Sequence, residues 1–160
     1  MAGTHGYQQL FTESVSTVTA TNSVALGTRR IESGVEYVYV YNAGTTAAVG
    51  FGMIQSLMSG YSVVVSSVTG NACFGVVANT DLEATSYGWL AVKGPVHIDM
   101  VGMNHVTAAT GMGIVLQTNG SFYTVTTGAT GYTWAHNKCG YTLTTIATAL
   151  TGAAYITCVG

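Results

Sequence analysis

Short runs of Val, Tyr, Ile and Thr recur along the whole chain and are separated by Gly, Asn and Ser. Runs of β-branched and aromatic residues bounded by turn residues are typical of strands. Leu, Lys, Glu and Arg, which favour helices, are too scarce to fill long helices. The pattern therefore predicts an all-β fold, either a β-barrel or a β-sandwich, in a single compact domain.

The densest of these runs, Val35–Tyr41 (VEYVYVY), is followed by the turn residues Asn42-Ala43-Gly44 and is predicted to be a strand. Helix-like apolar spacing occurs at Ala43–Ser59, but the glycines in this stretch reduce the expectation to a short turn. Other runs of the same kind predict further strands at Gln9–Ala20, Tyr61–Val68, Trp89–Val92, Val96–Val101 and Ala154–Val159.

Ile114–Val125 (IVLQTNGSFYTV) has the clearest hairpin pattern in the sequence. Asn119 and Gly120 lie between two runs rich in strand-forming residues, and both residue types tolerate a positive φ. We therefore predict a two-residue type I′ turn at Asn119-Gly120.

The length of 160 residues suits one domain. We expect an N-terminal arm at residues 1–11 and a single β domain at residues 12–160. Residues 71–94 and 137–160 have equal length, each begins with Asn-x-Cys, and each carries an aromatic residue five positions before its final Gly. Two related β units are one interpretation, and chance matching in a Gly-rich sequence is the other.

Charged residues form 6% of the chain, against about 25% in typical soluble domains. With a net charge of −2 the chain has no basic surface for phosphates, so a nucleic-acid partner is not expected. No run of about 18 apolar residues predicts a membrane span. Met1–Phe11 lacks the basic start and apolar block of a secretory signal, and we expect either synthesis in a cytoplasm or a mature product that has already been trimmed.

Few residues form a pattern that predicts chemistry. His97 and Asp99 share one face of a predicted strand, and His105 follows; solvated strand residues are the favoured interpretation over a metal or acid–base site. No nucleophile or nucleotide-binding motif is present. We therefore expect no enzyme activity, no metal and no cofactor.

The three cysteines, Cys73, Cys139 and Cys158, are widely spaced and form no metal-binding motif. Free buried thiols are the favoured interpretation, and a single disulfide is the alternative.

Two groups of charged residues stand out in a chain with so few. Asp81 and Glu83 are predicted to cap a loop. Arg29-Arg30, with Glu32 and Glu36 nearby, form the densest group. An internal ion-pair cluster is favoured for it, and contact with a partner protein is the alternative.

Four segments of the chain share features with one known family: Ala25–Arg30 (ALGTRR), Tyr37–Gly44 (YVYVYNAG), Phe74–Asn79 (FGVVAN) and Tyr87–Gly94 (YGWLAVKG). Together they resemble the capsid decoration (cement) proteins of tailed bacteriophages. The resemblance covers residues 24–94 and, more weakly, Lys138–Leu143 and Ala154–Gly160, whereas Asp99–Asn137 departs from it.

The resemblance implies a structural virion protein on the outer capsid surface. Such a protein binds the major capsid protein, bridges neighbouring subunits and stabilises the shell, commonly as a dimer or trimer, without catalytic residues. A sparsely charged surface suits this role because covering it costs little desolvation. From position and composition we expect the partner-binding residues to lie in the arm and at one edge of the fold: Tyr7, Leu10, Phe11, Arg29 and Arg30.

The alternative function is a receptor- or glycan-binding β module of a virion fibre or an extracellular adhesin. In that case Trp89, Tyr132 and Trp134 would stack on sugar rings, although core or interface packing is favoured for each.

Overall fold

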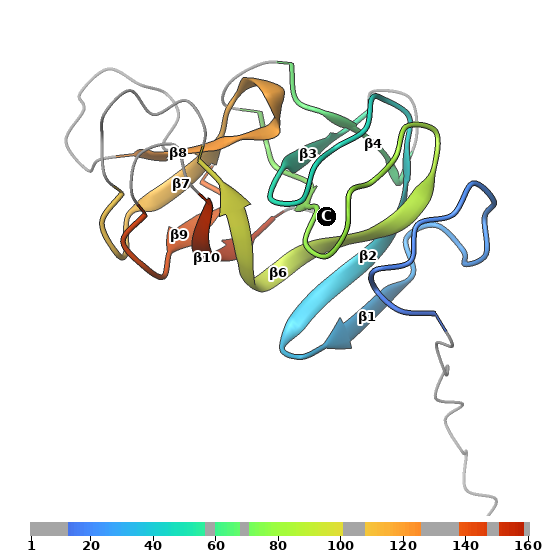
Figure 1. Cartoon of the computed structure of the whole chain (residues 1–160), viewed down its shortest axis with the longest axis horizontal. Coiled ribbons are helices and arrows are strands. Elements are labelled where there is room, and N and C mark those ends of the chain that lie inside the picture. The colour runs from blue at the N-terminus through green and yellow to red at the C-terminus, as the bar shows by residue number, and fades with distance from the viewer. Residues whose placement is uncertain are drawn as a thin grey trace, which may run out of the picture.

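The computed structural model describes residues 13–56, 60–67, 71–100, 108–125, 138–146 and 151–158. Within these residues ten strands belong to one sheet that is mostly antiparallel, and a three-residue 3-10 turn, η1 (Thr118–Gly120), is the sole helical element (Figure 1). The all-β prediction is confirmed. The strands are β1 (Arg29–Glu32), β2 (Val35–Asn42), β3 (Gly52–Gln55), β4 (Ser62–Val65), β5 (Gly75–Val76), β6 (Tyr87–Asp99), β7 (Gly113–Leu116), β8 (Phe122–Val125), β9 (Gly140–Thr142) and β10 (Thr151–Thr157).

Five strands close into a ring, in the order β2, β4, β3, β5 and β6, because β6 also pairs with β2. The β2–β4 pairing is parallel and the other four are antiparallel. β1 extends the sheet beyond the ring by pairing with the first half of β2. We call this part of the molecule, β2 to β5 with residues 87–93 of β6, the ring.

Alternate side chains of the ring strands fill its interior. Val38 and Val40 of β2, Met53 of β3 and Leu90 of β6 belong to one fully buried apolar cluster. The intervening side chains point outward and are also largely buried, for example Tyr39 of β2 and Trp89 of β6, because other parts of the chain cover the ring. The sequence of β2 is therefore a nearly continuous run of apolar residues.

β6 leaves the ring at Gly94-Pro95 without interruption, although the sequence predicted two strands separated there (Figure 1). Gly94 has φ +121°, and a Cβ at this position would lie 2.7 Å from the carbonyl oxygen of Gly34. The N–H of Cys158 donates to the Val92 carbonyl, so the backbone polar groups of every second residue of β6 from Val92 onward point toward β10. The backbone nitrogen of Pro95 therefore points away from β10. Proline is tolerated there because that position needs no ladder hydrogen bond to β10.

Residues 94–99 of β6 begin a second part, the C-terminal sheet, whose strand order is β6, β10, β9, β7, β8. One face of this sheet is buried in the second apolar cluster, through residues such as Ile98, Ile156 and Ile114. The opposite face carries Pro95 and His97, which are exposed. This alternation along Val96–Asp99 agrees with the sequence prediction.

The strand predicted nearest the N-terminus needs correction. Of the described residues in Gln9–Ala20, Thr19 alone forms a bridge, to Tyr87, and no strand is present. A turn, in which the Thr17 N–H donates to the Ser14 carbonyl at 3.0 Å, interrupts the extended backbone here. In its described part, Ala43–Ser59 contains no helix and has the expected short turn, which the Phe51 N–H closes by donating to the Ala48 carbonyl at 3.1 Å. The strand β3 follows this turn and was not predicted. The other predicted strands are confirmed within the described residues, with shorter bounds for β4.

The hairpin at β7 and β8 is confirmed, but its turn is longer than two residues. Leu116 is the last paired residue of β7, and Phe122 is the first of β8. Asn119 (φ 66°) and Gly120 (φ 78°) have the predicted positive φ. The turn is longer because the N–H of Gln117 bonds to the Ser121 carbonyl, which closes a three-residue loop over η1.

The proposed repeat units both contain a short strand after a cysteine that pairs antiparallel with a longer strand. In residues 71–94, Val76 lies opposite Ala91, whereas in residues 137–160 Thr142 lies opposite Ala154. The two units share an order of strands but differ in register by three residues, and the repeat stays a prediction.

Candidate functional site

One end of the strand order is β1, so its far side is a sheet edge on which the described residues place no further strand. Arg29 and Ile31 project to one face of β1, and Arg30 and Glu32 project to the other. Ile31 is 78% exposed, more than any other large hydrophobic side chain among the described residues. An apolar side chain on an open strand edge is a surface suited to contact with another protein.

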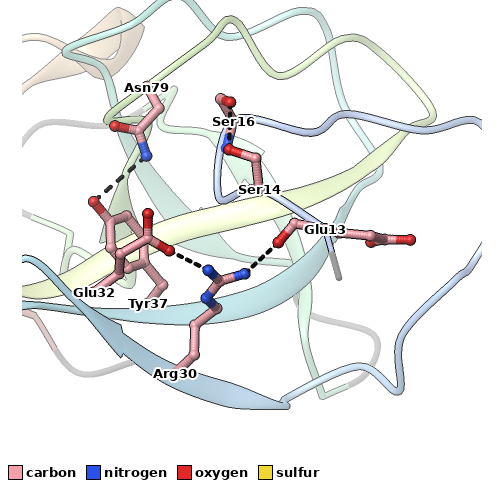
Figure 2. Close-up of polar contacts among 7 residues, drawn as sticks. All are labelled: Glu13, Ser14, Ser16, Arg30, Glu32, Tyr37 and Asn79. Atoms are coloured by element: carbon pink, nitrogen blue, oxygen red, sulfur yellow. Dashed lines mark hydrogen bonds and ion pairs between the residues drawn. The ribbon is translucent and has the colours of Figure 1, made fainter. Parts of the chain in front are cut away.

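Arg30 occupies the inner face of β1 and joins three parts of the chain (Figure 2). Its Nη1 donates to the carbonyl oxygen of Glu13 at 2.6 Å, and its Nη2 pairs with the Glu32 carboxylate. The guanidinium carbon lies 5.2 Å from the centroid of the Trp89 ring, within the range of a cation–π contact. With its side chain only 12% exposed, Arg30 holds the start of the described chain against the ring.

The segment 13–28 then lies over the outside of the ring. Thr19 and Tyr87 exchange two backbone hydrogen bonds, of 3.0 and 2.8 Å, and the hydroxyl groups of Ser23 and Tyr39 are 3.1 Å apart. Val15 is buried in the apolar cluster that the ring shares with the C-terminal sheet. These contacts fix the place at which residues 1–12 join the fold.

A tight turn leads from this segment into β1. Gly27 has φ +83°, and a Cβ here would overlap the Tyr61 ring, which lies 2.1 Å from that position. The N–H of Gly27 donates to the Tyr39 carbonyl at 2.8 Å, and the N–H of Tyr39 donates to Thr28 at 2.9 Å. Glycine is therefore required at position 27 for both conformation and space.

Arg29 has a different environment from Arg30. Its Nη1 lies 2.6 Å from Oε1 of Glu36, and its side chain is 46% exposed. Both arginines therefore form ion pairs within the chain, which is the interpretation that the sequence favoured. A contact of either arginine with a partner protein stays a prediction.

The remaining predicted contact residues, Tyr7, Leu10 and Phe11, lie outside the described residues. Sequence reasoning missed Ile31, although period-two alternation would have found it: if Arg30 and Glu32 share a face, Ile31 must lie on the other.

Other candidate residues are separated by the fold. His97 is exposed and Asp99 is half-buried on one face of β6, and His105 lies outside the described residues. In the part of the chain that the structure describes, no three His, Cys, Asp or Glu side chains are grouped so as to hold a metal ion.

Asp81 and Glu83 take part in loop contacts, as predicted. Asp81 Oδ1 accepts the Val49 N–H at 2.8 Å, and Glu83 Oε2 accepts the Thr46 hydroxyl at 3.1 Å.

Two of the aromatic residues considered for sugar stacking, Tyr132 and Trp134, lie outside the described residues. The third, Trp89, is 5% exposed and packs edge-on against Tyr39 at 5.1 Å between ring centroids. Core packing, the interpretation that the sequence favoured for Trp89, is therefore confirmed, and its covered indole ring is not available to stack on a sugar.

No helix in the described ranges is both long and apolar enough to cross a membrane.

Neither the known family models nor the curated proteins contain a match to this sequence. Among solved structures the chain is similar to the base of the head fiber gp8.5 of bacteriophage phi29, with a TM-score of 0.53. The similarity covers 76% of this chain and 94% of that one, at 9% sequence identity. At this identity the likeness shows a shared fold.

Proposed function

We propose that this chain is a structural protein of a tailed-phage virion, which binds the outer surface of the assembled head and bridges neighbouring major capsid subunits. The observation that carries the proposal is the open edge at β1, where Ile31 is exposed beside the point at which Arg30 anchors the N-terminal segment. The fold likeness to a head fiber base and the low charge of the chain support the same role.

The proposed contact has two adjacent parts. An extended segment of a capsid subunit adds to the β1 edge through backbone hydrogen bonds and covers Ile31. The arm, with Tyr7, Leu10 and Phe11, enters the fold at Glu13, so it binds the shell next to the same edge. Because Arg30 holds the Glu13 carbonyl, tension on the arm passes into the ring.

Many copies on a lattice turn weak contacts into stable binding. We further propose that copies of this chain associate with each other as dimers or trimers, and that the protein acts without catalysis or a cofactor. It would be made in the host cytoplasm and reside on the outer capsid surface.

Sedimentation with capsids tests the proposal. Heads assembled from the major capsid protein of the same genome are mixed with the purified chain, pelleted and assayed for bound protein, and the free chain's mass gives its oligomeric state. Ile31→Ser and deletion of residues 2–11 are each expected to weaken binding about tenfold or more, as loss of an apolar anchor does. Tyr141→Ser, an exposed residue of the C-terminal sheet, is the control and should bind normally.

Absence of the wild-type chain from the pellet at saturating concentration would contradict the proposal. Binding that survives both Ile31→Ser and the deletion would move the contact away from the β1 edge.

Glycan binding is the second candidate, and one observation favours it. Tyr141 and Tyr155 stack at 5.5 Å on the exposed face of the C-terminal sheet, and Tyr141 is 44% exposed. Exposed tyrosine rings can pack against sugars. Binding to a glycan array that Tyr141→Ala abolishes, together with no binding to heads, would favour this function.

A further inference from the structure

All three cysteines of the chain meet in one place, although they are far apart in sequence. Cys73 precedes β5, Cys139 precedes β9 and Cys158 follows β10. The Sγ atoms of Cys73 and Cys158 are 3.4 Å apart, and Cys73 also contacts the thiol of Cys139. All are free thiols in this structure. Cys73 and Cys139 belong to the apolar cluster between the ring and the C-terminal sheet, and Cys158 packs against it.

Strand pairing brings the first two cysteines together. β5 pairs with β6 at Ala91, and the N–H of Cys158 donates to the next residue, Val92, at 2.8 Å. The start of β5 and the end of β10 therefore meet at one point along β6. Cys139 lies beside them because its carbonyl accepts the N–H of Thr157, again at 2.8 Å.

The three thiols differ in environment. Cys73 and Cys139 are each 2% exposed, whereas Cys158 is partly exposed. Hydrogen bonding with Cys139 lowers the pKa of Cys73, but its contact with Cys158 and its burial outweigh this and raise the pKa well above the usual range. The hydrogen bond with Cys73 and burial likewise raise the pKa of Cys139 well above the usual range. An external oxidant therefore meets Cys158 first.

We propose that Cys73 and Cys158 are a latent disulfide that a small-molecule disulfide such as oxidised glutathione closes. The Cys158 thiolate attacks one sulfur of oxidised glutathione, forms a mixed disulfide and releases one glutathione thiolate. Cys73 then loses its proton and attacks the Cys158 sulfur, and the second glutathione leaves as a thiolate. Two protein thiols and one oxidised glutathione give one protein disulfide and two reduced glutathione molecules.

The bond would join the end of β10 to the ring, across a separation of 85 residues. Cross-linking residues so distant removes much of the freedom of the unfolded chain. We expect the oxidised protein to melt about 5–10 °C above the reduced protein. The inference concerns the chain alone and does not depend on the proposed virion role.

The test incubates the purified full-length chain with oxidised glutathione at about pH 8, near the ordinary pKa of a thiol. Titration with a thiol reagent under denaturing conditions should fall from three thiols to one. The intact mass should fall by about 2 Da, the mass of the two hydrogens lost. Peptide mapping without reductant should recover a linked pair of peptides containing Cys73 and Cys158.

Two variants separate the cysteines. Cys158→Ser should keep its remaining thiols reduced and lose the melting shift. Cys139→Ser is the matched control and should form the disulfide normally; serine can replace the thiol that lies 3.5 Å from the Ile114 carbonyl. If either variant fails to fold, peptide mapping of the oxidised wild-type chain still shows which two cysteines are linked.

Three outcomes would overturn the proposal: a linked Cys73–Cys139 peptide pair, a glutathione adduct on Cys158 that never resolves, or three thiols that persist after prolonged exposure. Stoichiometric zinc in the purified protein, bound by these thiols and lost in Cys73→Ser, would overturn it as well, since the cluster would then be a metal site.

Discussion

The ring and the C-terminal sheet differ in burial, and the residue patterns of their strands differ in the same way. In β2 almost every residue is buried, because the interior of the ring takes one face and other chain segments cover the second. In residues 94–99 of β6, exposed and buried residues alternate, because only one face of the C-terminal sheet is covered. Closure of the ring buries both faces of its strands, so β2 is a nearly continuous apolar run, whereas the strand of the open C-terminal sheet alternates.

β6 belongs to both parts and carries their main connection (Figure 1). Two smaller contacts connect them elsewhere. The Asn119 N–H at the β7–β8 turn donates to the Ser66 carbonyl at 2.8 Å, and the Asp99 N–H donates to the Gly50 carbonyl at 3.0 Å. Strands from both parts also pack together at Gly52. Variants at these places test whether the two parts unfold as one unit.

Leu90→Ala should have the largest effect on stability. Leu90 is fully buried inside the ring, and its truncation leaves a cavity that closed strands cannot easily fill. We expect a loss of about 2–5 kcal/mol in the free energy of unfolding, measured by urea denaturation. Because β6 continues into the C-terminal sheet, both parts should unfold in one transition at a lower urea concentration.

Lys93→Ala, at an exposed position of the same strand, is the control and should change stability by less than about 0.5 kcal/mol. Two separate transitions in Leu90→Ala, with the later one unshifted, would show instead that the C-terminal sheet is stable without the ring.

Gly52→Ala should come next, because it acts where the two parts touch. A Cβ at Gly52 would lie 2.5 Å from Leu116 Cδ1 and 2.6 Å from Phe122 Cζ. Overpacking of this kind costs about 1–3 kcal/mol. Combining Gly52→Ala with Phe122→Leu removes atoms from the crowded site, so a double-mutant cycle should give a favourable coupling energy. If the stability losses of the two single variants simply added up in the double variant, steric overlap between residue 52 and Phe122 would not be the cause of the loss.

Arg30→Ala and Arg29→Ala compare a buried anchor with an exposed ion pair on the same short strand. Arg30 donates to Glu13 and Glu32 and lies over Trp89, so its loss should cost about 1.5 kcal/mol. The pair formed by Arg29 is exposed, and its loss should cost about 0.5 kcal/mol or less. Thermal melting of both variants checks the order; equal effects would show that the Arg30 contacts add little.

Residue patterns predicted strands in both parts of the molecule, but they missed β3 and β5 in the ring and β9 in the C-terminal sheet. Val35–Tyr41 was predictable because an uninterrupted β-branched and aromatic run suits a strand buried on both faces. The continuity of β6 through Gly94-Pro95 was not predictable from the sequence. It depends on the pairing with β10, in which the backbone nitrogen of Pro95 points away from the neighbouring strand.

The candidate site was predictable only in part. Arg29 and Arg30 stand out in a sequence with so few charges, but their different burial depends on which face of β1 packs on Trp89. The convergence of Cys73 and Cys158 depends on two strands that meet along β6, and no local sequence pattern contains that information.

Asn119→Ala should have a smaller effect than Arg30→Ala and concerns the turn that joins the C-terminal sheet to the ring. Asn119 has φ 66°, a conformation that asparagine tolerates better than alanine, so the change should cost about 1 kcal/mol or less. The hydrogen bond to Ser66 uses the backbone N–H and survives the substitution. Asn119→Gly keeps the left-handed conformation accessible and should be nearly neutral in urea denaturation. If both variants were equally destabilised, the cost would arise from lost contacts of the Asn119 side chain, and the link between the two parts would depend on more than the backbone.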